Sequence, residues 1–316
     1  MLFSNRRGKI SHKEAQNIGN CRLEIASLFH PKKFPRKQLP ILEFTIPYGF
    51  CAFLWLIPFF VAASVHAQWL QHPTPGVPRL PDGSPNLNAP APRTPDGKPD
   101  LAGIWDIEHN KPCPPGGCAD MYVGQEFSDI GWSIRGLPYQ PWAAEITKKR
   151  TEDNGMADPI SHCLPGGIVK GLTIPLFRKI IQIPGLVVIL NELGSSYRQI
   201  FTDGRPLPPI DQPTFNGYSV GRWEGDTLVV ETTGFKDQMW LDRNGSPLTD
   251  AAKITERFRR VNFGKLEIAI TVDDPKAYTK PWTVKLNQLL ALDTELIDYL
   301  CVENEKDAGR YRETNK

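Results

Sequence analysis

Nine segments with the composition of β-strands follow one another between residues 179 and 305, and most of the links between them are short. They are KIIQI (179–183), LVVIL (186–190), SYRQIFT (196–202), YSVGRWE (218–224), TLVVETT (227–233), ITERFRRV (254–261), KLEIAITV (265–272), WTVKLNQLL (282–290) and ELIDYLCVE (295–303). The alternation of apolar and polar residues is cleanest at 265–272. So many consecutive strands predict an antiparallel meander over 179–305. A long meander removes its exposed edges by curling into a barrel.

The region before the meander, residues 101–178, is expected to supply a first strand, one short helix and a segment that covers the barrel. LAGIWDI (101–107) has the pattern of a strand, and 141–153 is expected to be the helix. Pro141 suits the first helical turn, and no helix-breaking residue follows it over this stretch. The fold class expected is therefore mainly β, and residues 306–316 are expected to form a C-terminal tail.

Residues 68–100 are rich in proline and contain a near-repeat. The two copies are RLPDGSPNL at 79–87 and RTPDGKPDL at 93–101. Such a composition favours polyproline II and turns, and it supplies no core of its own. We expect an extended segment, which is either a linker or an arm laid over the domain.

The first 67 residues have the order of a secretory leader. A basic segment precedes the uncharged run YGFCAFLWLIPFFVAA (48–63), and SVHAQ follows it. The run is shorter than the roughly 20 apolar residues of a membrane span. Cleavage after Ala67 is favoured over an uncleaved anchor. We therefore expect a periplasmic or extracellular protein that meets the membrane only through its leader, before cleavage.

Removing the leader changes the charge of the chain. The whole sequence carries a formal charge of +2, but residues 1–67 contain nine Lys and Arg against three Asp and Glu. The remainder is net acidic, so its charge gives no reason to expect a nucleic-acid partner.

Four cysteines remain after the leader, namely Cys113, Cys118, Cys163 and Cys301. An even count in an exported chain favours two disulfides. The turn-rich CPPGGC (113–118) could close on itself, and Cys163 would then pair with Cys301. The alternative is a metal site made by His109, Cys113, Cys118 and either His162 or Cys163.

The stretch GRWEGDTLVVETTGF (221–235) could be either a catalytic constellation or a hairpin. A two-residue type II′ turn at Gly225-Asp226 would place Trp223 opposite Leu228 and Arg222 opposite Val229. Side chains alternate between the two faces of a strand, so Arg222 and Glu231 would share the outer face as an ion pair. We therefore interpret this stretch as a hairpin.

Several long segments resemble those of an uncharacterised family of predicted exported bacterial β-rich proteins. They are RQIFTDGRPLP, GYSVGRWEGDTLVVETTGF, ITERFRR, DDPKAYTKPWTV and YLCVENE, which lie between about 175 and 305. This resemblance implies kinship and no particular activity. Separately, the Gly-Ile-Trp at 103–105 is similar to the Gly-x-Trp that opens the first strand of lipocalins. That similarity implies a calycin-like, ligand-binding barrel.

The connections of a meander alternate between its two ends, which predicts where a site lies. This parity places the long connections 203–216, 235–253 and 273–281 at one end, where binding and chemistry usually occur. The candidate site residues on them are Asp203, Arg205, Asp237, Trp240, Asp242, Asp274 and Tyr278, with Asp273 beside them. Acids and aromatics together suit a polar organic ligand.

The function expected from the sequence is the binding of a small organic molecule in the barrel mouth. A second possibility is a cofactor-free hydrolase or lyase that uses loop carboxylates and Tyr278. A third is an envelope interaction protein that acts through the proline-rich segment. The mature chain contains no G-x-S-x-G, H-E-x-x-H or P-loop motif, and no histidine lies in the strand region.

Overall fold

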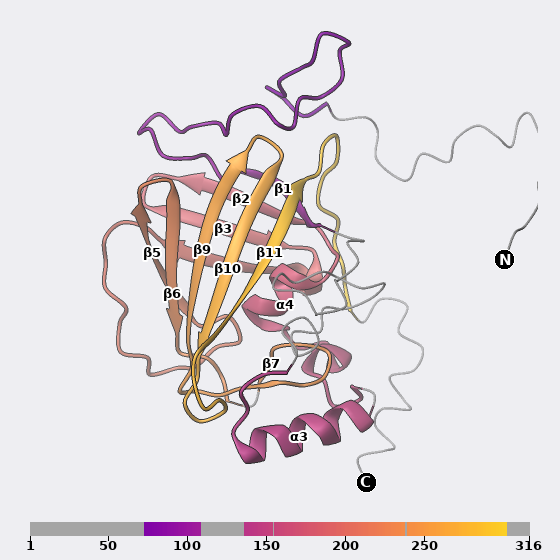
Figure 1. Ribbon diagram of the computed structural model, residues 1–316, viewed down its shortest axis with the longest axis vertical. Coiled ribbons are helices and arrows are strands. Elements are labelled where there is room, and N and C mark those ends of the chain that lie inside the picture. The colour runs from indigo at the N-terminus through magenta and orange to yellow at the C-terminus, as the bar shows by residue number, and fades with distance from the viewer. Residues whose placement is uncertain (1–72, 109–135, 154, 238, 302–316) are drawn as a thin grey trace, which may run out of the picture. The chain divides into compact units, whose positions relative to one another are not determined.

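The computed structural model describes residues 73–108, 136–153, 155–237 and 239–301, all within the compact unit His66–Lys316. Its centre is a closed barrel of strands in the order β1-β11-β10-β9-β6-β5-β4-β3-β2 (Figure 1). The barrel strands are β1 (Gly103–Ile107), β2 (Arg178–Ile183), β3 (Leu186–Asn191), β4 (Ser196–Phe201), β5 (Tyr218–Glu224), β6 (Thr227–Thr233), β9 (Lys253–Asn262), β10 (Lys265–Asp273) and β11 (Trp282–Leu290). The prediction of a mainly β barrel is confirmed.

The barrel is closed by β1 and not by the last predicted strand. Trp105 pairs with Leu290 of β11 and with Arg178 of β2, so β1 occupies the position between the two edges. Residues 295–300, expected to begin a strand, form none. Trp105 is fully buried, whereas Tyr299 and Leu300 stay exposed, so closure by β1 removes more apolar surface from water.

One strand pair departs from the predicted antiparallel pattern. Strand β5 lies parallel to β4, with Ile200 opposite Ser219 and Phe201 opposite Val220. A parallel neighbour requires the connecting chain to cross from one end of the sheet to the other. Residues 202–217 therefore run along the barrel and do not turn back at its end.

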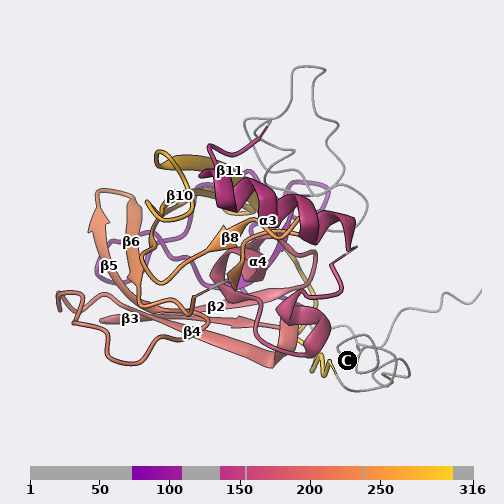
Figure 2. The same cartoon turned by 90° about the horizontal axis from the view of Figure 1, so that it is seen from below.

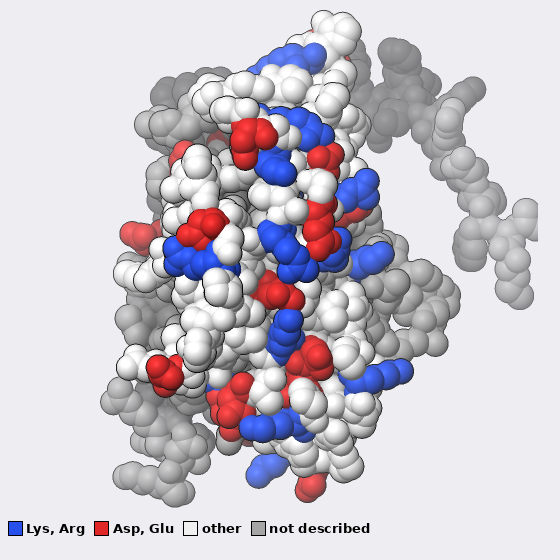
Figure 3. Space-filling view, turned by 90° about the vertical axis from the view of Figure 1, so that its left-hand side faces the viewer, with Lys and Arg blue, Asp and Glu red and all other residues white. Residues whose placement is uncertain are grey.

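The β5–β6 hairpin has the register expected from the sequence. Trp223 lies opposite Leu228 and Arg222 opposite Val229, and Gly225 at the turn has a φ of +58°. Arg222 lies on the outer face, 3.5 Å from a carboxylate oxygen of Glu231. Figure 3 shows this side of the molecule, where basic and acidic side chains alternate over the strands. This pairing supports the interpretation of the stretch as a well-made hairpin.

Two helices and a small hairpin cover the lower end of the barrel (Figures 1 and 2). Helix α3 (Pro141–Glu152) begins at the predicted proline, and the hairpin consists of β7 (Met239–Trp240) and β8 (Pro247–Leu248). Helix α4 (Gly167–Thr173) was not expected, because seven residues with two glycines give no periodic signal. Two short 3₁₀ turns are also present, η1 (Pro159–His162) and η2 (Leu193–Ser195).

Helix α4 lies against the inside of the barrel end. Its Ile168, Val169 and Leu172 are buried, and the Leu172 carbonyl accepts hydrogen bonds from Arg178 Nη1 at 2.9 Å and Gln288 Nε2 at 3.0 Å. These two strand side chains satisfy a carbonyl that the end of a helix leaves without an intrahelical partner. The lower opening of the barrel is thus filled by protein.

The proline-rich residues 73–100 form an arm along the opposite, upper end. Each copy of the near-repeat closes a small loop, with bridges Arg79 to Pro85 and Arg93 to Pro99. The second copy is anchored to the β5–β6 turn by an Arg93–Asp226 ion pair at 2.8 Å. Of the two alternatives left by the sequence, these contacts fit an arm laid over the barrel.

The disulfide between Cys163 and Cys301 is confirmed, and it ties the chain that follows β11 to the segment before α4. Cys163 is thereby removed from the alternative metal site, while His109, Cys113 and Cys118 lie outside the described residues. The described ranges contain no group of three or more His, Cys, Asp or Glu that could hold a metal ion. No helix within them is long and apolar enough to cross a membrane. The predicted leader, residues 1–67, also lies outside the described residues.

Candidate functional site

The predicted site residues separate into two groups. Asp203 and Arg205 begin the crossing segment 202–217 at the upper end, next to the Gly185 turn, and form an ion pair with each other at 2.6 Å. The other five lie at the lower end, on the β6–β9 loop (residues 234–252) and the β10–β11 turn (residues 274–281). The prediction that all three long connections meet at one end is therefore wrong for 203–216. The parallel β4–β5 pair breaks the alternation on which it depended.

Asp242 and Asp274 hold the turns in which they lie. Asp242 accepts hydrogen bonds from the backbone nitrogen of Ser246 at 2.9 Å and from its hydroxyl at 2.6 Å. Asp274 accepts two bonds of 2.7 Å from the backbone nitrogen and hydroxyl of Thr249. Both aspartates are about 1% exposed. Asp273 is the exposed last residue of β10. The buried carboxylates of Asp242 and Asp274 therefore have a structural role, because they fix the conformation of the loops at this end of the barrel.

Trp240 and Tyr278 form the floor under these loops. The Tyr278 hydroxyl donates a 2.7 Å hydrogen bond to the Pro247 carbonyl, and burial raises the pKa of this tyrosine well above its ordinary value. The Trp240 ring lies 4.7 Å from the guanidinium carbon of Arg150 and 5.5 Å from the ammonium nitrogen of Lys170. Both aromatic side chains are buried, so neither presents a face to solvent.

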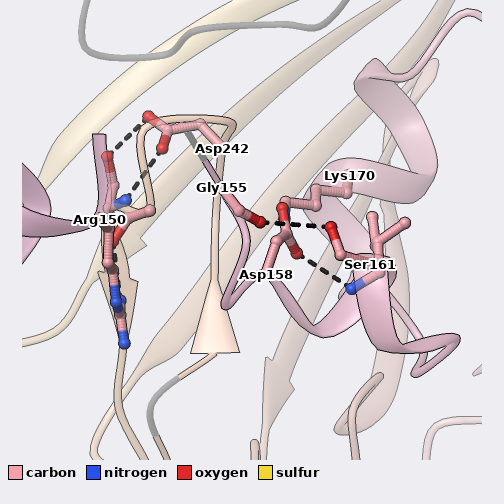
Figure 4. Close-up of polar contacts among 9 residues, drawn as sticks. Arg150, Gly155, Asp158, Ser161, Lys170 and Asp242 are labelled. Atoms are coloured by element: carbon pink, nitrogen blue, oxygen red, sulfur yellow. Dashed lines mark hydrogen bonds and ion pairs between the residues drawn. The ribbon is translucent and has the colours of Figure 1, made fainter. Parts of the chain in front are cut away.

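Lys170 and Asp158, which Figure 4 labels, form a buried ion pair, and the Lys170 ammonium lies 5.5 Å from the Trp240 ring. Lys170 Nζ is 2.6 Å and 2.7 Å from the two carboxylate oxygens, one of which also accepts a bond from the Ile160 nitrogen. Burial lowers the pKa of Lys170, and the Asp158 charge opposes that shift. The pair joins α4 to the segment before it. The lysine is 4% exposed, so it offers no accessible amine.

An open groove of about 520 Å³ lies between α3 and the two loops. We call it the α3 groove, and it is lined by Trp142, Ile146, Arg150, Asp237, Pro247, Thr249 and Lys276. The three helix residues are spaced four apart, so they lie along one face of α3. Trp142 is 44% exposed, and its indole N–H donates a 2.8 Å bond to the Lys276 carbonyl, which fixes the ring.

The charged residues of the α3 groove differ in how they are paired. Lys276 forms an ion pair with Asp250 at 2.6 Å. Arg150 donates one hydrogen bond, of 2.8 Å, to the Gly245 carbonyl, and within the described part of the chain no carboxylate lies within ion-pair distance of it. Burial lowers the pKa of this guanidinium. Asp237 is exposed and likewise has no cation within that distance among the described residues.

The inside of the barrel holds a second polar cluster that sequence reasoning missed. Arg198 makes two hydrogen bonds to the Glu256 carboxylate, one of them 2.9 Å long. It also bonds to the Ser219 hydroxyl at 3.0 Å and the Thr232 hydroxyl at 2.9 Å. Where Arg198 faces α4, the cavity measures only about 10 Å³, room for about one water molecule. The candidate site is therefore the α3 groove, outside the barrel.

Of the predicted residues, only Asp237 lines the α3 groove, and Trp142 and Arg150 were missed. Both belong to the predicted helix, and a signal was present: a tryptophan and an arginine eight residues apart lie on one face of a helix. In comparisons with protein-family models, curated proteins and solved structures, nothing matches this chain. The family resemblance thus stays a prediction.

Proposed function

We propose that this protein binds a small organic molecule in the α3 groove. The observation that carries the proposal is the groove itself, with its exposed and rigidly held Trp142. Its volume lies in the range typical of small-molecule sites, and its lining combines apolar surface with a few polar groups, as such sites do. The barrel supports this surface in the manner of a scaffold.

Binding is better supported than the alternative of a hydrolase or lyase. Asp242 and Asp274 already accept hydrogen bonds from the turns they hold, and the Tyr278 hydroxyl donates to a backbone carbonyl. A group that performs acid–base catalysis must reach the substrate. These three do not line the groove, which leaves Asp237 as the one carboxylate among the described residues that line it.

We also propose that the protein works in the periplasm or outside the cell, after cleavage behind Ala67. The long-range Cys163–Cys301 disulfide supports this, because disulfides persist in oxidising compartments. N-terminal sequencing of the protein recovered from the host envelope should begin at Gln68. Intact leader on protein from the soluble cytosol would contradict export.

The test of binding is a panel of small aromatic and polar fragments screened by ligand-observed NMR. Trp142→Ala removes the exposed stacking surface and should weaken any fragment bound in the α3 groove by about tenfold or more. Tyr197→Ala is the matched control, since Tyr197 is 65% exposed on β4, away from the groove. Fragment binding that is unchanged by the Trp142 substitution, or absent altogether, would contradict the proposal.

A further inference from the structure

Two side chains of opposite charge line the α3 groove without an ion-pair partner among the described residues. They are Arg150, near the C-terminal end of α3, and Asp237, on the β6–β9 loop. The third charged residue, Lys276, forms an ion pair with Asp250 at 2.6 Å, and the Asp237 charge acts on it from beyond ion-pair distance. The groove thus offers one positive and one negative charge for pairing with a bound molecule.

The position of Arg150 points to an anion. The guanidinium is held in place, because its carbon lies 4.7 Å from the centre of the Trp240 ring and its Nη1 donates a 2.8 Å hydrogen bond to the Gly245 carbonyl. A guanidinium carries five N–H donors in a fork that matches a carboxylate. Orienting the fork before binding reduces the entropy lost when an anion docks.

The apolar part of the lining sets the body of the ligand. Trp142, Ile146 and Pro247 contribute aromatic and aliphatic surface to the groove that the two charges line. A ligand that carried only a carboxylate would cover the Asp237 charge without pairing with it. A ligand that carried only an amine would cover the Arg150 charge without pairing with it. Either arrangement would remove water from a charge without replacing it.

We infer that the ligand of this groove is a zwitterion with an apolar body, of the size of an aromatic amino acid or a dipeptide. Its carboxylate pairs with Arg150, its ammonium group pairs with Asp237, and its side chain packs on Trp142. This inference rests on the proposed function and names the ligand class for the same groove.

Matched dipeptides test it by calorimetry or ligand-observed NMR. The parent probe is L-alanyl-L-phenylalanine, the N-acetyl form lacks the ammonium charge, and the C-terminal amide lacks the carboxylate. Each cap should weaken binding about threefold to fivefold, the effect of losing one partly exposed ion pair. Asp237→Asn should weaken the parent to the same degree and change the N-acetyl form less than twofold. Arg150→Met should likewise weaken the parent and leave the amide nearly unchanged.

Two further variants serve as controls. Arg150→Lys keeps the cation and should retain part of the affinity that Arg150→Met loses, provided that both variants melt like the unmodified protein. Arg222→Met removes an arginine from the outer face of the hairpin and should change no affinity.

The possible failures are distinguishable. If the capped peptides bind as tightly as the parent and Asp237→Asn has no effect, the zwitterion is overturned, while binding in the groove stands. The zwitterion is also overturned, and binding in the groove also stands, if no dipeptide binds but neutral aromatic fragments do and Trp142→Ala abolishes their binding. If neither fragments nor dipeptides bind, the proposed function falls as well.

Discussion

The Arg198–Glu256 pair inside the barrel permits a quantitative test of what holds the core. The Arg198 side chain is 5% exposed and the Glu256 side chain is 0% exposed. Arg198→Met leaves the Glu256 charge buried without its partner, and Glu256→Leu leaves the Arg198 charge in the same state. Breaking a buried pair in this way costs about 3–5 kcal/mol of unfolding free energy.

The double variant, with Met at 198 and Leu at 256, should cost less than either single change. It removes both charges at once, and apolar side chains of similar volume often replace a buried pair with little loss. The two hydroxyls that Arg198 contacts keep each other as partners, since the Ser219 and Thr232 oxygens lie 2.9 Å apart. The cycle should therefore show a coupling of several kcal/mol between positions 198 and 256.

Urea unfolding followed by far-UV circular dichroism measures all four proteins of the cycle. In a separate thermal melt, the single variants should unfold about 6–20 °C below the parent, as expected for a unit of this size. The reasoning is refuted if either single change costs less than about 1 kcal/mol. It is refuted equally if the double variant costs the sum of the two, because independent sites give additive effects.

Three further outcomes are expected. Replacing Cys163 and Cys301 with Ala should lower the unfolding free energy by about 4–5 kcal/mol in urea, since the bridge spans 138 residues; an unchanged midpoint would contradict this. Because burial raises the folded-state pKa of Tyr278, its stabilisation is complete below pH 10 and declines above it. The advantage of wild type over Tyr278→Phe should thus shrink by up to about 1.4 kcal/mol per pH unit above 10, and a constant difference in urea unfolding would refute it. Arg222→Met should cost at most about 1 kcal/mol in the same assay, because its side chain is 58% exposed, and a loss above 2 kcal/mol would show a larger role.

The strands could be predicted because their pattern is local. Leu266, Ile268 and Ile270 alternate along β10, and the Gly225 turn fixes the register of its hairpin. The pairing of β5 with β4 could not be obtained in this way. The rule that connections alternate between the two ends assumes that each strand runs antiparallel to the one before it. The connection 202–217 is long enough for β5 to run either antiparallel or parallel to β4, and in the structure it runs parallel. That single uncertainty moved Asp203 and Arg205 to the wrong end of the barrel.

The site was predictable in part. The sequence correctly predicted that 235–253 and 273–281 meet at one end of the barrel, but it gave Asp242 and Asp274 as ligand-binding residues, and in the structure their carboxylates hold turns. The missed interior pair did leave a signal. Arg198 precedes Ile200 by two residues and Glu256 follows Ile254 by two, so each charge falls on the core-facing side of its strand. The groove exists because of how α3 packs against the two loops, and no local sequence pattern predicts the separation between the helix and the loops.

The position of β1 has a consequence for how the chain folds during its synthesis. Trp105 is synthesised early, yet its partner Leu290 is among the last strand residues to appear. Until then β1 and β10 each present an unpaired edge, and any product that stops before β11 keeps both edges permanently. Open edges recruit strands from other chains, so premature termination should give aggregates rather than a smaller soluble barrel.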